Sequence, residues 1–286
     1  MGGTESFDRA AALLPGALRC EALFQPEELR KRAEEIRLRC GRGASIYLPD
    51  QTIKLRSPVD DEAIGETLER ATRCSFYAAE ETLRAGYFTA EGGLRLGFGG
   101  RLILHEGRPV GYQSISSVNI RIPHAVNCVT DELFSALCGK SVLIYSSPGG
   151  GKTTFLRDLV RRVSDSGFRV SLVDERGELA ALCGGKSQFD VGENTDVIEG
   201  CPKLTASEML LRTMSPQVLA VDELSSAEMP FLSSGLASGV SLLATAHAGE
   251  FRELLRLGIA PGRFDLGLRI ENSGGKRSYH VEEMAC

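Results

Sequence analysis

The stretch SVLIYSSPGGGKTTFLRDLV, residues 141–160, decides the fold class of this 286-residue chain. It begins with an apolar run that has the length of a buried strand, and it ends with apolar residues at the spacing of an amphipathic helix. Between them, Gly-Gly-Gly-Lys-Thr-Thr at 149–154 matches most of the phosphate-loop pattern G-x-x-x-x-G-K-[ST], whose first glycine is Ser146 here. The stretch therefore predicts a strand, a phosphate-binding loop and a helix.

The composition of the loop suits the binding of a nucleotide. A strand–loop–helix unit directs several backbone N–H groups, together with the positive end of the helix, at a single point. Glycines let the backbone approach a phosphate without a Cβ atom in the way. We expect Lys152 to contact the β- and γ-phosphates of ATP and the hydroxyl of Thr153 to bind Mg²⁺. The expected nucleotide-binding residues are Ser147, Pro148, Gly149, Gly150, Gly151, Lys152, Thr153 and Thr154.

Two alternatives bear on this loop. A glycine-rich turn that happens to precede a lysine would leave the strand and the helix around it unexplained. The serine at position 146 matters only through its backbone, because the later glycines are the ones that lie against phosphate. If Ser146 keeps a negative φ it costs little, and a positive φ would cost about 1 kcal/mol. Neither case abolishes the site.

An acidic motif lies further along the chain. QVLAVDE, residues 217–223, is an apolar strand that ends in Asp222 and Glu223. An acid at the end of a neighbouring strand can help to hold Mg²⁺, so Asp222 joins Thr153 as an expected metal-binding residue. Glu223 is then placed to polarise a water molecule for attack on the γ-phosphate. Two solvated carboxylates are the alternative, and the phosphate loop upstream favours the functional interpretation.

Two further strand ends carry polar residues. VSLLATAH, residues 240–247, ends in Thr245 and His247, and we expect His247 to sense the γ-phosphate rather than to cap the next helix. VDERGELAA, residues 173–181, follows the helix after the phosphate loop and gathers acidic residues and an arginine at the same sheet edge. This cluster either contacts the nucleotide, bridges to a neighbouring subunit or is a solvated turn, and the spacing leaves these open. Its charged residues are Asp174, Glu175, Arg176 and Glu178.

An arginine from a neighbouring subunit can complete a site that transfers phosphate. The candidates are Arg95, Arg101, Arg121 and Arg212, and a surface position is the default for each. Arg121 is favoured because it lies in NIRIP, close to a predicted domain boundary.

The character of the chain changes near residue 125. Before it, helical runs and strand-like runs are grouped, which predicts a smaller α+β domain over 1–125. PEELRKRAEE is an expected helix, IRLRC and ASIYLP are expected strands, and VDDEAIGETLERATRCSFYAAEETLRAG is an expected pair of helical runs. LRLGFGGRLILHEGRPVGYQSISSVNIRIP predicts two or three strands with turns at GG and HEGRP. After residue 125, apolar strands alternate with helices, which predicts a P-loop α/β domain over 126–286 with a mostly parallel sheet covered by helices.

The bulk composition excludes several classes. The chain is 42% apolar and 25% charged, with a net charge of −5 and a pI of about 5.6, so we expect no nucleic-acid partner. Its eight cysteines include no CxxC pair, which argues against a zinc site. The sequence has neither a basic, apolar leader nor a run of about 18 apolar residues. We therefore expect a cytoplasmic protein that reaches a membrane only through partners.

Several quoted segments together carry a family resemblance. They are SSPGGGKTTFLRDLV, VDERGELAA, DVGENTDVIEGCPK, LLRTMSPQVLAVDE and LLATAHA, with EEIRLRCGRGASIYL, GGLRLGFGGR and SVNIRIPHAV before them. In this order and spacing they resemble the stage III sporulation protein AA family, P-loop ATPases of endospore-forming bacteria that are similar to the secretion ATPases of type II and type IV systems. The resemblance covers most of the chain. The segment from DVGENTDVIEGCPK to TMSPQVLAVDE is far more specific than a phosphate loop.

The resemblance implies a cytoplasmic hexameric ring that powers or helps to assemble a channel between mother cell and forespore. Its implied partners are other copies of the chain and membrane-embedded channel components at the cytoplasmic face. Lys152 and Thr153 match the Walker-A residues and Asp222 and Glu223 the Walker-B pair, while His247 matches the histidine of the strand-end box. Two departures are Ser146 and the segment DELSSAEM, where the pattern is DEIG.

Three other functions stay open on the sequence alone. A secretion or pilus motor would use the same motifs. A structural ring would bind ATP and turn it over negligibly. An RNA- or DNA-associated P-loop protein is disfavoured by the acidic charge balance.

Overall fold

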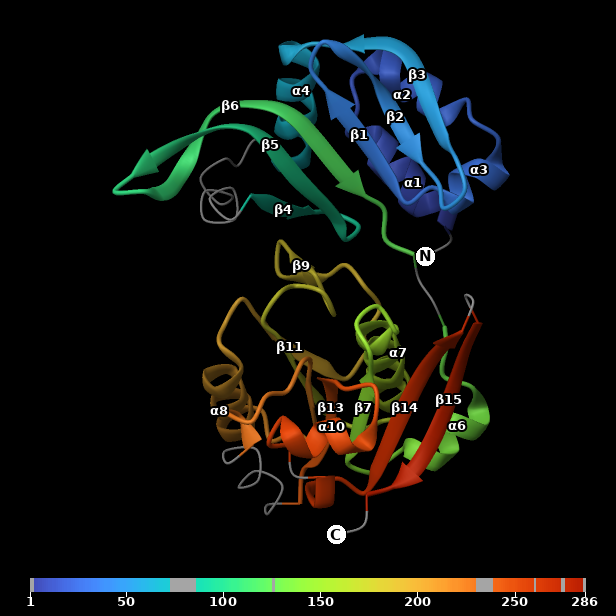
Figure 1. Cartoon of the computed structure of the whole chain (residues 1–286), viewed down its shortest axis with the longest axis vertical. Helices are drawn as coiled ribbons and strands as arrows, with labels where there is room; N and C mark the ends of the chain where they lie inside the picture. The colour runs from blue at the N-terminus through green and yellow to red at the C-terminus, as the bar shows by residue number, and fades with distance from the viewer. Residues whose placement is uncertain are drawn as a thin grey trace. The chain divides into compact units, whose positions relative to one another are not determined.

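The computed structural model describes residues 3–72, 86–124, 127–229, 239–259, 261–273 and 276–284. The chain folds as two compact units (Figure 1). One comprises residues 1–125 together with 183–188, and the other comprises 126–182 and 189–286. No helix within the described ranges is long and apolar enough to cross a membrane.

The N-terminal unit is an antiparallel sheet with helices on one face. Its strands are β1 Glu35–Arg39, β2 Arg42–Tyr47, β3 Thr52–Val59, β4 Tyr87–Ala90, β5 Leu94–His105 and β6 Arg108–Arg121, in the order β3-β2-β1-β6-β5-β4. Its helices are α1 Gly3–Ala12, α2 Gly16–Leu23, α3 Glu27–Arg32 and α4 Asp61–Thr72. This is the predicted α+β class, with the helix after Pro26 and the strands around GRG at the expected places.

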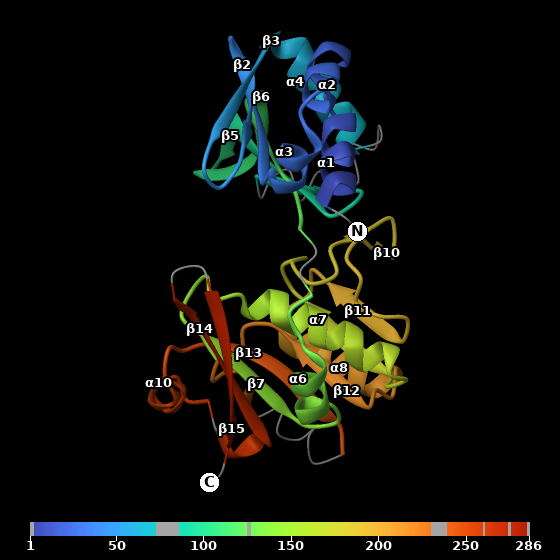
Figure 2. The same cartoon turned by 90° about the vertical axis from the view of Figure 1, so that its right-hand side faces the viewer.

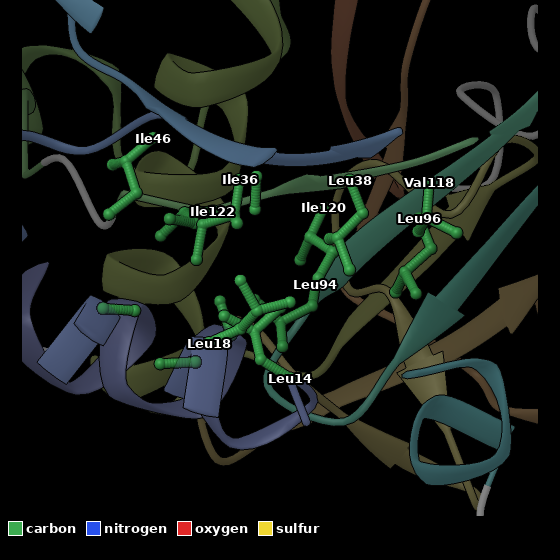
Figure 3. Packing of buried hydrophobic residues seen from close by; sticks show 14 of the residues in the cluster. Leu14, Leu18, Ile36, Leu38, Ile46, Leu94, Leu96, Val118, Ile120 and Ile122 are labelled. Carbon is green, nitrogen blue, oxygen red and sulfur yellow. The ribbon is translucent and has the colours of Figure 1, made fainter. Parts of the chain in front are cut away.

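Alternation along the strands builds the core of this unit. Ile36 and Leu38 on β1 are fully buried, whereas the residues between and beside them are only partly covered. Figure 3 shows these two side chains facing Leu14, in the turn after α1, and Leu18 of α2. One face of the sheet is therefore dry, and the opposite face is left polar.

Some local expectations for this unit were wrong. We expected a turn at Gly99-Gly100, but β5 runs through both glycines and pairs with β6 along its whole length, with a register shift there. A Cβ on Gly100 would lie 2.1 Å from the carbonyl oxygen of Ser114, so the pair marks a bulge where two strands approach closely. The turn forms at Glu106-Gly107. Helices α1 and α2 and strand β3 were not predicted, and most of the second expected helical run, 73–85, lies outside the described residues.

The second unit contains a seven-stranded sheet in the order β11-β8-β12-β13-β7-β14-β15. Its strands are β7 Val142–Ser146, β8 Val170–Asp174, β11 Thr195–Glu199, β12 Val218–Val221, β13 Ser241–His247, β14 Leu266–Ser273 and β15 Lys276–Glu283. A separate two-stranded hairpin, β9 Leu182–Cys183 and β10 Lys186–Ser187, lies almost entirely in residues 183–188, which belong with the N-terminal unit. Every neighbouring pair in the large sheet is parallel except β14 with β15. The four predicted strands are all present, and β11 and the β14–β15 hairpin extend the sheet.

Helices cover both faces of this sheet, as the continuous apolar strands predicted (Figures 1 and 2). The helices are α6 Asp131–Leu137, α7 Lys152–Asp165, α8 Lys203–Thr213 and α10 Phe251–Arg256, with the short η2 Pro261–Arg263. One core combines strand residues with α6 and α7, and the other combines them with α8 and α10. The residues expected on the inner face of α7, Phe155, Leu156, Leu159, Val160 and Val163, are all buried.

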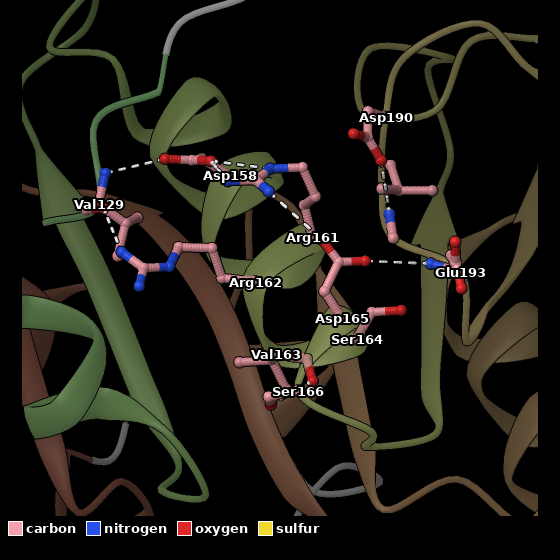
Figure 4. Close-up of polar contacts among 12 residues, drawn as sticks. Val129, Asp158, Arg161, Arg162, Val163, Ser164, Asp165, Ser166, Asp190 and Glu193 are labelled. Carbon is pink, nitrogen blue, oxygen red and sulfur yellow. Dashed lines mark hydrogen bonds and ion pairs between the residues drawn. The ribbon is translucent and has the colours of Figure 1, made fainter. Parts of the chain in front are cut away.

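A buried carboxylate fixes the start of this unit to α7. Asp158, whose side chain is 3% exposed, accepts hydrogen bonds from the backbone N–H groups of Cys128 and Val129 at 2.7 and 2.8 Å. Arg161 Nη2 lies 2.8 Å from the same carboxylate, and Arg162 Nη1 donates to the carbonyl of Val129 at 2.6 Å (Figure 4). The chain is thereby held against the helix that follows the phosphate loop.

Replacing Asp158 by Ala should lower the free energy of unfolding by about 3 kcal/mol, because the variant leaves Arg161 and two buried N–H groups without their acceptor. Urea unfolding followed by circular dichroism measures this change. Asp131→Ala is the matched control, since Asp131 is 93% exposed and its ion pair with Arg162 should contribute less than about 1 kcal/mol. Equal stability of the two variants would contradict the anchoring role.

Candidate nucleotide-binding site

The phosphate loop adopts the backbone that its glycines allow. Gly149 and Gly151 have φ values of +75° and +99°, in the region that side chains rarely enter. Gly151 is the N-cap of α7, so the first free N–H groups of this 14-residue helix point into the loop. Local sequence thus produces a turn lined by backbone donors at the positive end of a helix, which is an anion-binding geometry.

Ser146 fits the loop without strain. Within the described residues, the non-glycine residues with a positive φ are Glu106, Ala181, Ser215 and Glu223, so Ser146 falls into the inexpensive alternative. Its hydroxyl donates to the carbonyl of Ser147 at 2.9 Å. A Cβ on Gly150 would lie 2.2 Å from Ser146 Oγ, so the serine occupies the space beside that glycine. The replacement of the first glycine therefore keeps the loop intact.

Lys152 lies buried beneath the loop and is 5% exposed. Its Nζ is 3.3 Å from the carbonyl oxygen of Ser146 and 3.1 Å from Nδ1 of His247. Burial lowers the pKa of Lys152, and the nearby charges of Asp222 and Glu223 offset only part of that effect. Since these contacting atoms are neutral, no anion of the described part of the chain directly contacts the amino group.

Strand pairing brings His247 to the loop. β13 lies beside β7, and His247 is opposite Ser146 in the parallel register. An ammonium group can only donate, so Nδ1 of His247 accepts from Lys152 and the proton belongs on Nε2. Nε2 is 3.0 Å from Oε1 of Glu223. The histidine thus connects the phosphate-loop lysine to the expected general base.

Asp222 joins the first turn of α7 to the strand ends. Thr153 Oγ1 donates to Asp222 Oδ2 at 2.9 Å, and Thr245 Oγ1 donates to Oδ1. We expected the strands that end in Asp222 and in His247 to neighbour β7. β13 does, but β12 lies beyond it, and Asp222 reaches Thr153 across β13. Burial raises the pKa of Asp222, against the effect of the two threonine hydrogen bonds. The carboxylate is therefore held where a cation would favour its charged form.

The pair Thr153–Asp222 fits the demands of Mg²⁺. A hydroxyl and a carboxylate oxygen are hard ligands, and Mg²⁺ is usually held by one or two protein oxygens with the rest supplied by phosphates and water. The raised pKa of Asp222 fits the same function, because a bound dication would offset the cost of its burial.

Glu223 has a strained backbone and two partners on its side chain. Its φ is +51°, and its N–H donates to Thr245 Oγ1 at 2.8 Å. The two carboxylate oxygens are engaged separately, Oε1 with His247 and Oε2 with Arg176 at 3.1 Å. Burial raises the pKa of Glu223, but the His247 hydrogen bond and the Arg176 charge outweigh it and hold the pKa below the usual value. Such strain concentrates at functional sites.

The acidic cluster after β8 is built into the same edge of the sheet. Asp174 is 2% exposed and accepts from the N–H groups of Glu178, Leu179 and Ala180 at 2.8, 2.9 and 2.7 Å, so it shapes the loop rather than facing solvent. Its neighbours reach the end of β12. Arg176 pairs with Glu223, and Glu175 lies 3.5 Å from Lys203 Nζ.

Lys203 completes this arrangement from α8. Its Nζ donates to the backbone carbonyl of Glu223 at 2.6 Å. The role was not expected, because nothing in the local pattern of an isolated lysine relates it to a strand end. A cleft lined by these charged side chains opens at this edge, and its lining residues are Asp174, Glu175, Arg176, Glu178, Lys203, Asp222 and Glu223.

The candidate trans arginines differ in their surroundings. Arg121 ends β6 in the N-terminal unit, 65% exposed, with Nε 3.8 Å from Glu35 Oε1. Arg95 stacks on the ring of Tyr87 at 4.4 Å. Arg101 and Arg212 are exposed, on β5 and in the last turn of α8. The structure therefore brings together Lys152, Thr153, Asp222, Glu223 and His247, whereas the arginine assignment stays a prediction.

Comparison with known proteins identifies relatives of this chain. A family model described as "Sporulation stage III, protein AA" matches residues 9–263. The stage III sporulation protein AA of Bacillus subtilis (strain 168) is 34% identical over 256 residues, which covers 86% of this chain and 83% of that protein.

Solved structures of similar fold include an ATPase and a pilus motor. The ATPase DotB of Legionella pneumophila gives a TM-score of 0.56 at 14% identity, over 89% of this chain and 76% of that one. The pilus retraction motor PilT, in a crystal structure with bound ADP, gives 0.63 at 14% identity, over 88% and 79%. At these identities the likeness establishes the fold alone, a mostly parallel sheet covered by helices.

Asp222→Asn should stabilise the nucleotide-free protein at neutral pH. The pKa of Asp222 is raised in the folded protein, so its ionisation lowers the free energy of unfolding. This loss is complete above the folded-state pKa and absent below the usual aspartate pKa. The stability gained by Asp222→Asn should thus grow as the pH rises from the usual aspartate pKa to the folded-state pKa, and it should stay constant above that. Melting temperatures of both proteins across this range measure it. The exposed Asp196→Asn is the control, and a gain that persists at the lowest pH would contradict the assignment.

Proposed function

Because this chain belongs to the sporulation stage III, protein AA family, we propose that it binds and hydrolyses ATP in a ring of identical subunits. The observation that carries the proposal is the convergence of Lys152, His247 and Glu223 beside the Thr153–Asp222 pair at the end of one parallel sheet. Ligands of such sheets bind at the carboxyl ends of the strands.

Each side chain has a role that follows from its contacts. Lys152 binds the β- and γ-phosphates, which would supply the direct anionic partner that its buried amino group lacks. Thr153 and Asp222 hold Mg²⁺, which when bound neutralises charge on the phosphate oxygens. His247 lies between Lys152 and Glu223, so a γ-phosphate that draws Lys152 away would alter the hydrogen bond of His247. This supports its role as the γ-phosphate sensor.

Glu223 orients the attacking water and accepts its proton. In the free chain both of its carboxylate oxygens are occupied, by His247 and by Arg176, and its pKa is held low. A carboxylate in this state is a weak base, and its two partners compete with water for its lone pairs. We infer that hydrolysis needs one of the two partners to move, and that the isolated chain turns over slowly.

Assembly is the proposed means of completing the site. The ring is a hexamer in which the exposed Arg121 of one subunit reaches the nucleotide of the next. The partners are further copies of the chain and membrane-embedded channel components, approached from the cytoplasmic side, and nucleic acid is not among them. The alternative, a structural ring that binds ATP with little turnover, is favoured by the doubly paired Glu223.

Two variants separate binding from hydrolysis. Lys152→Ala should lose ATP binding, at least 100-fold in Kd, because a charged phosphate contact disappears. Glu223→Gln should keep the affinity and lose hydrolysis, by about 100-fold or more. Isothermal titration and steady-state phosphate release measure the two effects. Retained affinity in Lys152→Ala would refute the phosphate-loop assignment, and equal rates for wild type and Glu223→Gln would favour the structural ring.

Mixed assemblies test Arg121. With Mg²⁺ and ATP, light scattering should give six times the 30.8 kDa of one chain. Arg121→Ala should reduce the hydrolysis rate about 1,000-fold. Mixing inactive Arg121→Ala with inactive Glu223→Gln should restore part of the activity, because some interfaces then combine an intact Glu223 with an intact Arg121. A monomer at all concentrations, or no recovery on mixing, would exclude Arg121 as a trans residue.

A further inference from the structure

Arg277 lies against the phosphate loop, although no sequence pattern singled it out. A Cβ on Gly151 would be 3.0 Å from both Cζ and Nε of Arg277 and 3.3 Å from Nη2. The guanidinium therefore packs on the backbone of the residue that caps α7. The glycine at 151 is needed here for two reasons, its φ of +99° and the space that Arg277 fills.

The face of β15 that carries Arg277 is turned towards α7. Alternate residues of a strand share a face, so Arg277 and Tyr279 are on the same side. The ring of Tyr279 packs on Phe155 of α7, with ring centroids 5.1 Å apart. Lys276 and Ser278 belong to the opposite face. The hairpin β14–β15 pairs with β7 through β14, so this placement follows from the sheet itself.

The charge of Arg277 is unbalanced at this place. Other arginines of the unit have carboxylate partners, such as Arg176 with Glu223 and Arg269 with Glu271. Across the described residues, no carboxylate forms an ion pair with Arg277. Its exposed side chain lies instead beside the positive N-terminal end of α7, which repels it. A cation at such a position is stabilised when an anion binds between these groups.

Sheet order indicates which part of a nucleotide this cation would meet. His247 and Glu223 come from β13 and β12, on one flank of β7, and they mark the side of the γ-phosphate. Arg277 comes from β15, on the other flank of β7. A nucleotide that extends along the loop presents its transferred phosphate to the first flank and its remaining phosphates to the second.

We propose that Arg277 binds the phosphates that stay on ADP, in the site of its own chain. This inference rests on the proposed function, that is, on nucleotide binding at the phosphate loop. Arg277 would then contribute equally to the affinity for ATP and for ADP. A trans arginine, in contrast, would contact the γ-phosphate and so affect ATP alone. A planar guanidinium suits this role because it can donate two parallel hydrogen bonds to a phosphate.

Titration of the full-length protein with ATP and with ADP tests the proposal. Arg277→Ala should raise Kd roughly 10- to 100-fold for both nucleotides, the usual effect of losing a hydrogen bond to a charged group. Arg277→Lys should recover part of the affinity, because it keeps the charge without the paired donors. Lys276→Ala is the matched control on the opposite face of the same strand and should leave both Kd values unchanged. Melting curves establish that each variant is folded.

The outcomes distinguish this inference from the proposed function. Unchanged affinities in Arg277→Ala, with Lys152→Ala still defective, would overturn the role of Arg277 and leave the phosphate loop assigned. A loss confined to ATP would move Arg277 to the γ-phosphate and also overturn the proposal. An equal loss in Lys276→Ala would attribute the effect to the hairpin as a whole. Wild-type protein that binds neither nucleotide would refute both proposals together.

Discussion

The hydrogen bond from Thr153 to Asp222 joins the parts on which the site depends. It links the first turn of α7 to the end of β12, across the intervening β13. Thr245 of β13 bonds to the same carboxylate and also receives the N–H of Glu223. One buried carboxylate thus fixes a helix and two strand ends relative to one another, and the geometry of Lys152 and His247 follows from that fixed edge.

Several residues of the site are held in unfavourable environments or conformations. Burial disfavours the charged forms of both Lys152 and Asp222, and Glu223 is held in a left-handed backbone conformation. These costs are borne by the packing of the sheet, whose strands are buried on both faces. Such preorganisation at the expense of stability is expected where charged ligands must be bound and released.

The sequence predicts the parts of this architecture that local patterns encode. The four core strands and α7 were predicted because buried parallel strands are continuously apolar and a covering helix has a 3.6-residue period. Strand order is not local, so the separation of β12 from β7 by β13 could not be inferred. The same holds for Lys203 and Arg277, since each reaches the site from an element distant in the chain. The strand through Gly99-Gly100 was missed because glycine marks a bulge as readily as a turn.

The contact between Ser146 and Gly150 has a consequence for how this loop can vary. Because the serine hydroxyl fills the space that a Cβ at 150 would need, 2.2 Å away, the two positions share one volume. A larger residue at 150 is compatible only with a smaller one at 146, so substitutions at these sites must be coupled rather than independent. The phosphate loop thus tolerates serine in place of its first glycine, and in return position 150 must remain glycine.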